Sequence, residues 1–477
     1  MLRLYTTCLV IYVVSVLGAA DGLFIDGCPI WGCRPSGSFS MYLDVPRKNV
    51  SVSWVSDVIM DPIPGVMGCV ADSVNIVCQS NGPFKEDKGY VTLNLENGTL
   101  YWRDKLLHFP TLPLLDNYGD VTGSDGHRLV HYDADGKTYP IIKCYGLDPM
   151  FSMQLVGTTF LLLVGEQGGL VVRLTNAIPV AVIFLNATIQ NTNGTFLPIS
   201  QPVVNGQRFY VLTEFVPEDE MYDASLLNLQ RLYAIDVHDR SADIMTIAWF
   251  YNFEMEHRPL QRPGQVVYRK DHLAYLRDNI NTIQNVLWDY STGSVYVTLP
   301  PPYMMNRARS FWIFLDATDD VKLSFRSDTL QVAHMATFET NTGLSVPSAD
   351  YVWVASSDGK FLKIGKNGNV SSSFDVSILI GGPLTITSKV TLARDSDDGD
   401  DVLLFGATLV TKTQPTNIVL AVLPGTSPVV LWGTAVPDNM VVLGQLTGAD
   451  GAASRIPDQI IFYAETAGKT ARIVSLH

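Results

Sequence analysis

Thr92-Leu-Asn-Leu-Glu-Asn-Gly-Thr-Leu-Tyr-Trp102 is the clearest copy of a pattern that recurs along this 477-residue chain. Apolar and polar residues alternate up to Leu95, an Asn-Gly pair follows, and a second short run ends on the tryptophan. Alternation predicts a strand with one buried face, and Asn-Gly between two such runs predicts a tight hairpin turn. The stretch therefore predicts a β-hairpin whose second strand carries an aromatic side chain.

Looser copies of this hairpin occur at Leu232–Asp236 with Ile247–Trp249, Val130–Lys137, Phe361–Asn369, and Val419–Gly425 leading to Trp432. Between them, β-branched and aromatic runs alternate with Gly, Asp, Asn and Pro clusters about every ten residues, which is typical of sheets packed face to face. Only Asp219–Leu229 has a fair helical pattern. Because no linker or charge block divides the chain after residue 49, reuse of one hairpin predicts a single all-β unit over residues 50–477.

These units resemble the blades of pyrroloquinoline-quinone-type (PQQ-like) propeller repeats, in the quinoprotein-dehydrogenase-like superfamily. The family repeat reads Ala-x-Asp-x-x-Thr-Gly-x-x-x-Trp; this chain keeps the spacing of Gly98 and Trp102 but has Asn94 in place of the aspartate. The stretch Pro113–Gly136 is similar to the family's succession of two strands and an Asp-Gly turn. The resemblance implies a single β-propeller of four-stranded antiparallel blades, and it carries over no function.

Each blade of such a ring packs against both neighbours, so an outer tryptophan can dock on the glycine turn of the next blade. The alternative is that these tryptophans are ordinary core aromatics without a fixed register. At roughly 45 to 60 residues per blade, a mature chain of ~457 residues gives about seven to nine blades, with about eight as the best estimate. Because an unpaired edge at the seam exposes backbone groups, we expect a strand at Val50–Val55 to share a blade with strands from Asp458–Leu476.

Two acidic segments, Arg394–Ala407 and Gly448–Phe462, resemble the calcium loops of integrin-type (FG-GAP) propeller repeats. In the first, the side chains of Asp395 and Asp397 and the carbonyl of Asp401 offer oxygen ligands, while a glycine and a leucine occupy the other ligand positions. These oxygens fall short of the six to eight that calcium takes. The sequence therefore predicts a solvated loop that binds calcium weakly at most, and it predicts no other cofactor.

The N-terminus reads as a secretory signal peptide over residues 1–20, cut after Ala20. Arg3 precedes an apolar run, Cys8–Leu17, that is about half the ~20 residues a bilayer span needs; a signal anchor is the alternative. Five N-glycosylation sequons follow, at Asn49, Asn97, Asn186, Asn193 and Asn369. With no long apolar run further on, we expect a secreted, extracellular glycoprotein without a membrane span in its mature part.

Five cysteines remain after the signal peptide, and they would lie in an oxidising compartment. Proximity favours two local disulfides and one leftover thiol, namely Cys28 with Cys33, Cys69 with Cys78, and Cys144 alone. Asp72-Ser73 would form the turn of the second pair, although other pairings remain open. A zinc site is the rival interpretation, but the chain has no C-x-x-C pair. The first pair marks residues 21–49 as a Cys-containing N-terminal segment before the propeller.

The sequence contains no recognisable catalytic or cofactor-binding motif. It lacks the G-x-S-x-G, H-E-x-x-H, Walker and G-x-G-x-x-G patterns, and it has none of the adjacent-cysteine pairs that the quinone-dependent relatives carry over their cofactor. His127 and His131 lie four apart on a predicted strand, where we interpret them as surface histidines rather than a metal pair. No catalytic residue is predicted.

The net charge of −14, from 33 basic and 47 acidic residues, disfavours nucleic acid as a partner. Our leading hypothesis is an extracellular binding or structural module whose loop face or central channel recognises a protein or glycan. The alternative is a secreted propeller enzyme, an oxidoreductase or hydrolase, with its site in the central channel. The sequence leans toward the first but does not decide whether the protein is an enzyme.

Overall fold

The computed structural model describes residues 27–477 with gaps. The gaps are 49, 61–67, 82–87, 108–109, 117, 126–127, 140–141, 144–149, 158–159, 166–167, 174–178, 199–200, 219–228, 239–243, 253–285, 290–293, 299–311, 317–321, 328–333, 338–350, 366–367, 395–398, 412–413, 452–455 and 467–469. The predicted signal peptide, Cys144 and all of the helical candidate Asp219–Leu229 except its last residue therefore lie outside the described residues.

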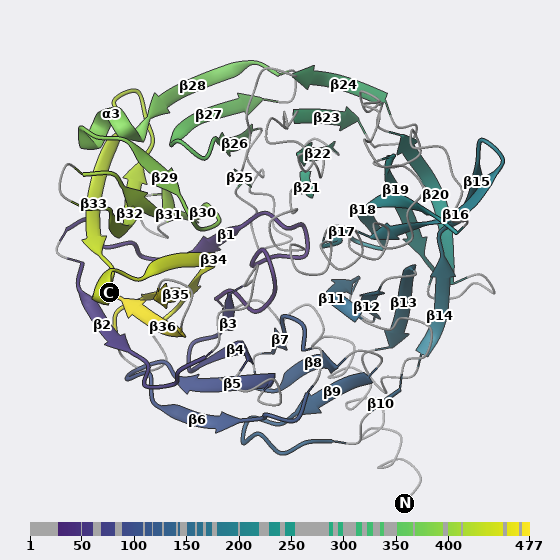
Figure 1. Ribbon diagram of the computed structural model, residues 1–477, viewed down its shortest axis with the longest axis horizontal. Helices are drawn as coiled ribbons and strands as arrows, with labels where there is room; N and C mark the ends of the chain where they lie inside the picture. Colours follow the sequence, from purple (N-terminus) through teal and green to yellow (C-terminus); the bar gives the residue numbers. More distant parts are fainter. Residues whose placement is uncertain are drawn as a thin grey trace, which may run out of the picture.

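The protein is a β-propeller, in which antiparallel sheets stand around a ring (Figure 1). The described residues form eight sheets, which we number in chain order. Sheet 1 comprises β3 (Cys69–Ala71), β4 (Asn75–Asn81), β5 (Lys88–Asn94) and β6 (Leu100–Arg103). Sheet 2 comprises β7 (Leu114–Leu115), β8 (Val121–Asp125), β9 (Arg128–Tyr132) and β10 (Ile142–Lys143). Sheet 3 comprises β11 (Met150–Val156), β12 (Phe160–Gly165), β13 (Gly168–Arg173) and β14 (Pro179–Phe184).

The ring continues through sheets 4 to 6. Sheet 4 comprises β15 (Asn186–Ile189), β16 (Thr192–Pro198), β17 (Val203–Asn205), β18 (Arg208–Pro217), β19 (Gln230–Val237) and β20 (Met245–Asn252). Sheet 5 comprises β21 (Val286–Asp289), β22 (Ser294–Thr298), β23 (Trp312–Asp316) and β24 (Lys322–Ser327). Sheet 6 comprises β25 (His334–Ala336), β26 (Tyr351–Ala355), β27 (Lys360–Gly365) and β28 (Val370–Asp375), and α3 (Val376–Ile380) follows it.

Sheets 7 and 8 complete the ring. Sheet 7 comprises β1 (Ser40–Tyr42), β29 (Leu384–Ile386), β30 (Thr391–Arg394), β31 (Asp401–Leu409), β32 (Thr416–Leu423) and β33 (Val429–Ala435). Sheet 8 comprises β34 (Val441–Ala449), β35 (Gln459–Thr466), β36 (Thr470–Leu476) and β2 (Val52–Val55), and the 3-10 helix η3 (Pro437–Asn439) precedes it. Parts of the ring lie outside the described residues, so the eight sheets are a count of the described part only. The number of blades in the whole ring stays a prediction.

Sheets 4 and 7 each have six strands rather than the expected four. In sheet 4, the hairpin β15–β16 is added before the inner strand β17, and both β16 and β17 pair with the long strand β18. In sheet 7, β29 and β30 both pair with β31, and β1 from the N-terminal region adds a parallel strand beside β30. The four-stranded unit is therefore present with local additions, which a repeat pattern does not predict.

The ring closes where the sequence predicted. β2 pairs antiparallel with β36, with Val52 opposite Leu476 and Val55 opposite Val474. Ser51 N donates to His477 O at 2.9 Å, which extends the ladder to the last residue. This pairing gives sheet 8 its outermost strand from the N-terminal region, so the first and last parts of the chain close the ring together.

Trp102 docks on a glycine turn of the next sheet, as the hairpin pattern predicted. It lies opposite Thr92 in the ladder of β5 and β6, and its Nε1 donates to Ala134 O of sheet 2 at 3.1 Å. Gly136 of that turn has φ +79°, and a Cβ there would lie 2.5 Å from Trp102 Cγ. The indole therefore occupies the space that only glycine leaves open, so this tryptophan has a fixed docking register.

Trp54 of β2 repeats the arrangement one sheet earlier. Its Nε1 donates to Leu95 O at 2.9 Å, and a Cβ at Gly98, whose φ is +69°, would lie 2.6 Å from Trp54 Cδ2. Trp432 of β33 differs, because its Nε1 donates to Pro46 O of the N-terminal region at 2.7 Å. Trp102 and Trp54 thus both dock on a glycine turn of the next sheet, whereas Trp432 docks on the N-terminal region.

Candidate functional site at the centre of the ring

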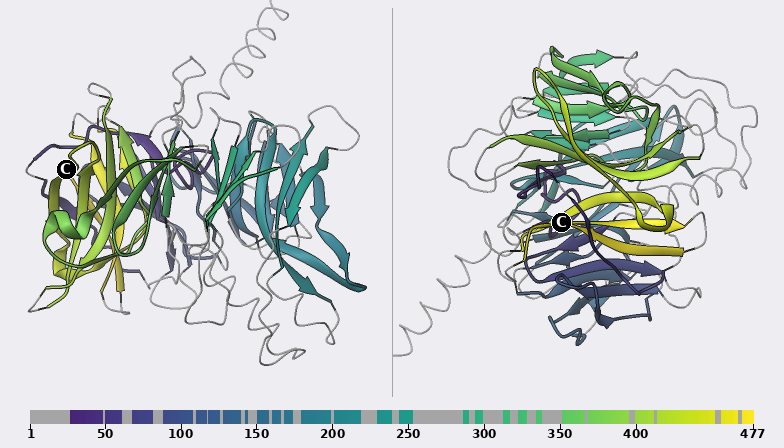
Figure 2. Two further views of the ribbon diagram at one scale, coloured as in Figure 1. Left: turned by 90° about the horizontal axis from the view of Figure 1, so that it is seen from above. Right: turned by 90° about the vertical axis from the view of Figure 1, so that its left-hand side faces the viewer.

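Residues 28–43, which we call the central segment, run through the centre of the ring (Figure 1). Main-chain bonds tie it to five sheets: Cys28 N to Ala71 O (3.0 Å), Ala71 N to Cys28 O (3.0 Å), Leu115 N to Pro29 O (3.0 Å), Val204 N to Pro35 O (2.8 Å), Thr337 N to Ser38 O (3.0 Å) and Leu392 N to Phe39 O (2.7 Å). β1 then pairs with β30 from Ser40 to Tyr42. Figure 2 shows the segment close to the face of the ring that carries the C-terminus.

Tight turns inside the central segment let it fit this space. Cys33 N donates to Ile30 O at 3.0 Å, and Phe39 N donates to Gly32 O at 2.8 Å. A Cβ at Gly32, where φ is +73°, would lie 2.8 Å from Gly37 Cα, so only glycine permits this approach. Cys33 itself has φ +61°, an uncommon conformation for a residue with a side chain, and its disulfide to Cys28 holds it there.

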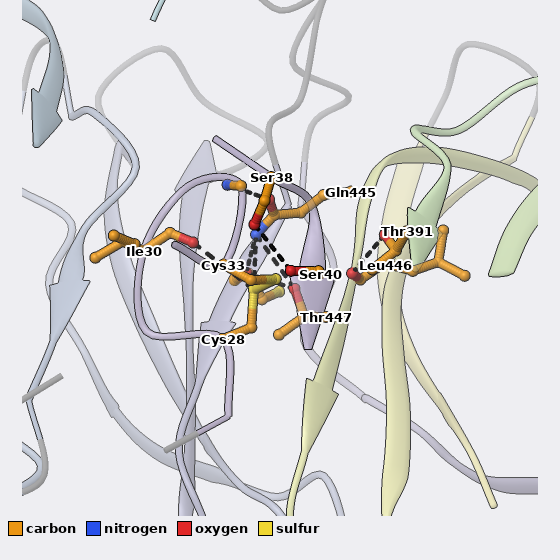
Figure 3. The surroundings of a disulfide bond; sticks show 11 residues. Cys28, Ile30, Cys33, Ser38, Ser40, Thr391, Gln445, Leu446 and Thr447 are labelled. Atoms are coloured by element: carbon orange, nitrogen blue, oxygen red, sulfur yellow. Dashed lines mark hydrogen bonds between the residues drawn. A yellow bond between two sulfur atoms is a disulfide. The ribbon is translucent and has the colours of Figure 1, made fainter. Parts of the chain in front are cut away.

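A buried polar network joins the disulfide loop to sheets 8 and 1 (Figure 3). Gln445 Oε1 accepts a hydrogen bond from Gly32 N at 3.0 Å, while Gln445 Nε2 donates to Cys69 O at 3.0 Å. Thr447 Oγ1 also donates to Cys69 O, at 2.6 Å. Gln445 and Thr447 are fully buried, so these bonds satisfy polar groups that would otherwise be costly inside the ring.

Apolar side chains of the central segment extend the core of the ring. Trp31 and Phe39 meet edge to face with ring centroids 5.3 Å apart, and both are buried in a cluster with Val70 of sheet 1. Met41 and Leu43 join a second cluster with strands of sheets 7 and 8. The central segment therefore packs on both its polar and its apolar sides.

This packing changes the interpretation of the central channel. The sequence left the channel open as the site of a ligand or of catalysis, but the chain's own N-terminal segment occupies the centre of the ring. Among the described residues, no group of three or more His, Cys, Asp and Glu side chains is placed to hold a metal ion.

Two basic groups lie at the inner side of sheets 6 and 7: half-buried His334 on β25 and buried Lys389 between β29 and β30. Burial lowers the pKa of Lys389 to about 8. Burial, and then the nearby positive charge of Lys389, lower the pKa of His334 to about 3, so the imidazole is neutral at neutral pH. His334 Nδ1 has no hydrogen-bond partner within the part of the chain that the structure describes. Neither residue was singled out from the sequence as a site, because burial of this kind depends on contacts far apart in the chain.

The four described sequon asparagines, Asn97, Asn186, Asn193 and Asn369, are all exposed, and Asn49 lies outside the described residues. Asn186 and Asn193 share the hairpin β15–β16, which projects from the rim of the ring (Figure 1). There Thr195 Oγ1 donates to Asn186 Oδ1 at 3.0 Å and Thr188 Oγ1 donates to Asn193 Oδ1 at 2.8 Å, so both amides lie on one face. Their exposure fits the expected glycosylation, which stays a prediction.

The predicted calcium loop is described only in part. Asp395 and Asp397 lie outside the described residues. The carboxylate of Asp401 accepts from Arg394 Nε at 2.9 Å and also contacts Tyr351 Oη, which joins sheets 6 and 7. Burial, together with this carboxylate, raises the pKa of Tyr351. The Asp401 side chain thus has a structural role, and the prediction of weak calcium binding is untested.

Both local cysteine pairs are at bonding distance. Cys28 and Cys33 have their α-carbons 4.2 Å apart, and those of Cys69 and Cys78 are 4.3 Å apart across β3 and β4. Asp72 makes the turn between these strands, because its Oδ1 accepts from Val74 N at 2.7 Å. The turn expected at Asp72-Ser73 is therefore present.

The histidine pair noted in the sequence is described at only one of its positions. His127 lies outside the described residues. His131 is half-buried on β9, where its Nε2 lies 3.6 Å from Asp120 Oδ2 and its Nδ1 lies 3.1 Å from Thr122 Oγ1. These contacts occupy both ring nitrogens of His131 within its own sheet.

A surface that the sequence did not single out lies at the joint of sheets 1 and 2. Tyr101 is 55% exposed, and its Oη donates to Asp135 Oδ1 at 3.0 Å, which raises the pKa of Tyr101. Tyr118 is 71% exposed in the β7–β8 turn, where its N donates to Asp116 Oδ1 at 2.9 Å. A Cβ at Gly119 would lie 3.3 Å from Ala134 Cβ, so the β7–β8 turn that carries Tyr118 lies beside the β9–β10 turn that carries Asp135. We call Tyr101, Tyr118 and Asp135 the tyrosine surface.

Comparisons with known proteins do not identify a family. No family model and no curated protein matches the chain. Among solved structures it is similar to BamB from Moraxella catarrhalis, with 11% identity and a TM-score of 0.45 over 79% of this chain and 95% of that one. It is also similar to BBS1N in complex with ARL6DN (14%, 0.42, 78% and 99%) and to the Neurospora crassa Pan2 WD40 domain (10%, 0.41, 80% and 97%). With identities of at most 14% and TM-scores below 0.5, these likenesses assign neither the PQQ-type nor the integrin-type repeats to the chain.

Proposed function

We propose that this protein is a secreted, N-glycosylated propeller that binds a protein partner through the outside of its ring. The tyrosine surface is the observation that carries the proposal. Tyrosine is enriched where protein interfaces are most strongly held, because it buries a large ring and still offers a hydroxyl. Tyr101 and Tyr118 present such rings to solvent from strands and turns whose backbones are already hydrogen-bonded.

Rigidity of this surface favours binding. Trp102 and Gly136 lock sheet 1 to sheet 2 directly beside Tyr101, and Asp135 fixes the tyrosine hydroxyl. Side chains and turns that are already ordered lose less conformational entropy when a partner binds.

Secretion is supported by two features. Two cysteine pairs lie at disulfide distance, which suits an oxidising compartment. The four described sequon asparagines are exposed to solvent. As a separate finding, none of the helices among the described residues is long and apolar enough to cross a bilayer. No observation in the described part of the chain favours the enzymatic alternative, so we develop only the binding function.

Secretion is tested by expressing the full chain in a eukaryotic cell. We expect it in the medium, with Asp21 at its N-terminus. Protein retained in the cell with Met1 intact contradicts this part of the proposal.

Binding is tested by placing a photo-reactive amino acid at Tyr118 and, as a control, at Val370, which is 52% exposed on the outer strand of sheet 6. We expect irradiation on living cells to give one defined protein adduct from position 118 and not from position 370. The adduct should disappear when Tyr101 is also changed to Ser. Identical adducts from both positions, or a carbohydrate as the only bound species, refute the proposal of a protein partner at this surface.

A further inference from the structure

We infer that the centre of the ring is a binding site for a peptide that forms a disulfide loop followed by a short strand, and that the central segment is its resident ligand. A second copy of that segment, supplied as a separate molecule, then binds the same site. The inference is independent of the proposed function, because it concerns the centre of the ring and not its outer surface.

The central segment contacts the ring in the way that a bound peptide contacts the edge of a β-sheet. The bonds between the central segment and the inner strands join main-chain atoms, and they reach Ala71, Leu115, Val204, Thr337 and Leu392 from five sheets. β1 adds a parallel strand to β30, with Ser40 opposite Leu392 and Tyr42 opposite Arg394. Addition of a strand to a free sheet edge is a general mode of peptide binding, in which main-chain bonds give affinity and side-chain pockets give specificity.

Side chains supply the specificity. Trp31 is 4% exposed and Phe39 is 6% exposed, and the two rings pack edge to face in the main core cluster. Buried aromatic anchors of this kind carry most of the affinity in protein interfaces. Gly32 adds polar specificity, because its N–H donates a hydrogen bond to Gln445 Oε1 in the buried network of Figure 3.

The Cys28–Cys33 disulfide shapes the ligand before it binds. It closes a loop of five residues' separation around Gly32, the residue that Gln445 recognises. A closed loop has fewer conformations to lose on binding, so the oxidised peptide is expected to bind more tightly than the reduced one. The same cysteines are buried in the folded ring, so the loop is a feature of the ligand and not of an exposed surface.

The covalent connection between the central segment and the ring is the stretch of chain that leads to β2. After Val45 the chain leaves the centre of the ring. Beyond this point Pro46 O accepts a hydrogen bond from Trp432 Nε1, and the Arg47 guanidinium lies 3.6 Å from the Asp400 carboxylate. Lys48 is exposed, and β2 begins only at Val52. A cut after Lys48 therefore separates the central segment covalently while β2 stays paired with β36.

The experiment uses the full chain with a site-specific protease sequence inserted after Lys48. The protein is folded, purified and then cut, so the cut does not affect folding. If the insertion itself prevents folding, the protease sequence is placed after Pro46 instead. A fluorescent synthetic peptide covering residues 27–44, in its oxidised form, is added to the cut protein, and its binding is followed by anisotropy.

We expect saturable exchange of the labelled peptide for the resident segment, with β-sheet circular dichroism unchanged. A peptide with Trp31→Ser and Phe39→Ser should bind at least about tenfold more weakly, since each truncated anchor costs more than the ~1.4 kcal/mol that a tenfold change represents. A scrambled peptide with the same disulfide spacing is the control. Loss of the β-sheet signal when the segment leaves, absence of exchange, or equal binding of the scrambled peptide overturns the inference, because each shows an ordinary piece of core.

Discussion

Replacing Gly98 by alanine is expected to weaken the joint between sheets 8 and 1. Gly98 has φ +69°, and an added Cβ would lie 2.6 Å from Trp54 Cδ2, so the indole must move. Trp54 is 8% exposed, and its Nε1 donates to Leu95 O at 2.9 Å. The substitution therefore combines backbone strain with displacement of a docked tryptophan.

The size of the effect follows from three contributions. A left-handed conformation costs about 1 kcal/mol or more for a residue with a Cβ. Overpacking of a buried contact costs about 1–3 kcal/mol. Weakening the indole hydrogen bond costs about 1 kcal/mol. Gly98→Ala should thus lower the free energy of unfolding by roughly 3–5 kcal/mol. Gly206→Ala is the matched control, because Gly206 has φ +57° with nothing within 4 Å, and it should cost only about 1 kcal/mol.

A double-mutant cycle with Trp54→Ala isolates the docking contribution. Without the indole, Gly98→Ala should cost no more than the control, so the coupling between positions 54 and 98 should be about 2–4 kcal/mol. Urea midpoints give the free energies, and hydrogen exchange at the amides of β2 and β5 locates the effect, since a chain of this size need not unfold in one step. If Gly98→Ala costs the same whether or not Trp54 is present, the docking argument is wrong.

Three further predictions concern processing, disulfides and pH. Secreted protein should begin at Asp21 and lose mass on enzymatic removal of N-glycans; an unchanged mass contradicts the glycosylation prediction. Replacing Cys69 and Cys78 by serine should lower the free energy of unfolding by roughly 2–3 kcal/mol, the cost of freeing a short loop, whereas peptide maps that join either cysteine to another partner refute the pairing. Burial, with nearby Lys389, lowers the pKa of His334 to about 3 from 6.5, so the unfolded chain takes up a proton that the folded chain does not as pH falls between these values. Stability should therefore fall in that window, and His334→Gln should make the fall smaller; identical pH profiles contradict the shift.

Features fixed by neighbouring residues were predictable from the sequence. The hairpin Thr92–Trp102 has its turn glycine and tryptophan where the spacing placed them, and Asp72 turns the chain between two paired cysteines. Closure of the ring by β2 was predictable for a different reason, because an open seam leaves backbone groups unpaired whatever the residues are.

Features fixed by distant residues were not predictable. Gly32 bonds to Gln445 across 413 positions, and nothing near Gly32 in the sequence signals that partner. The hairpin β15–β16 also departs from simple rules, because its turn is made by Gln190 and Asn191, both at positive φ, rather than by the nearby Asn193-Gly194 pair. The exposed Tyr118 was missed because a tyrosine in a loop carries no signal until its turn is seen to be rigid.

The N-terminal region fixes the seam between sheets 8 and 1 from two sides. Inside the ring, the Gly32–Gln445–Cys69 network joins the inner strands of these sheets through the central segment. Outside, β2 completes sheet 8 and carries Trp54 to the turn of sheet 1. A chain that began after residue 60 would lose both fixations at once, although most of every blade would remain. Under the binding function proposed above, a seam locked from both sides would keep sheet 1 stiff, so that Tyr101 would lose little conformational entropy when a partner binds.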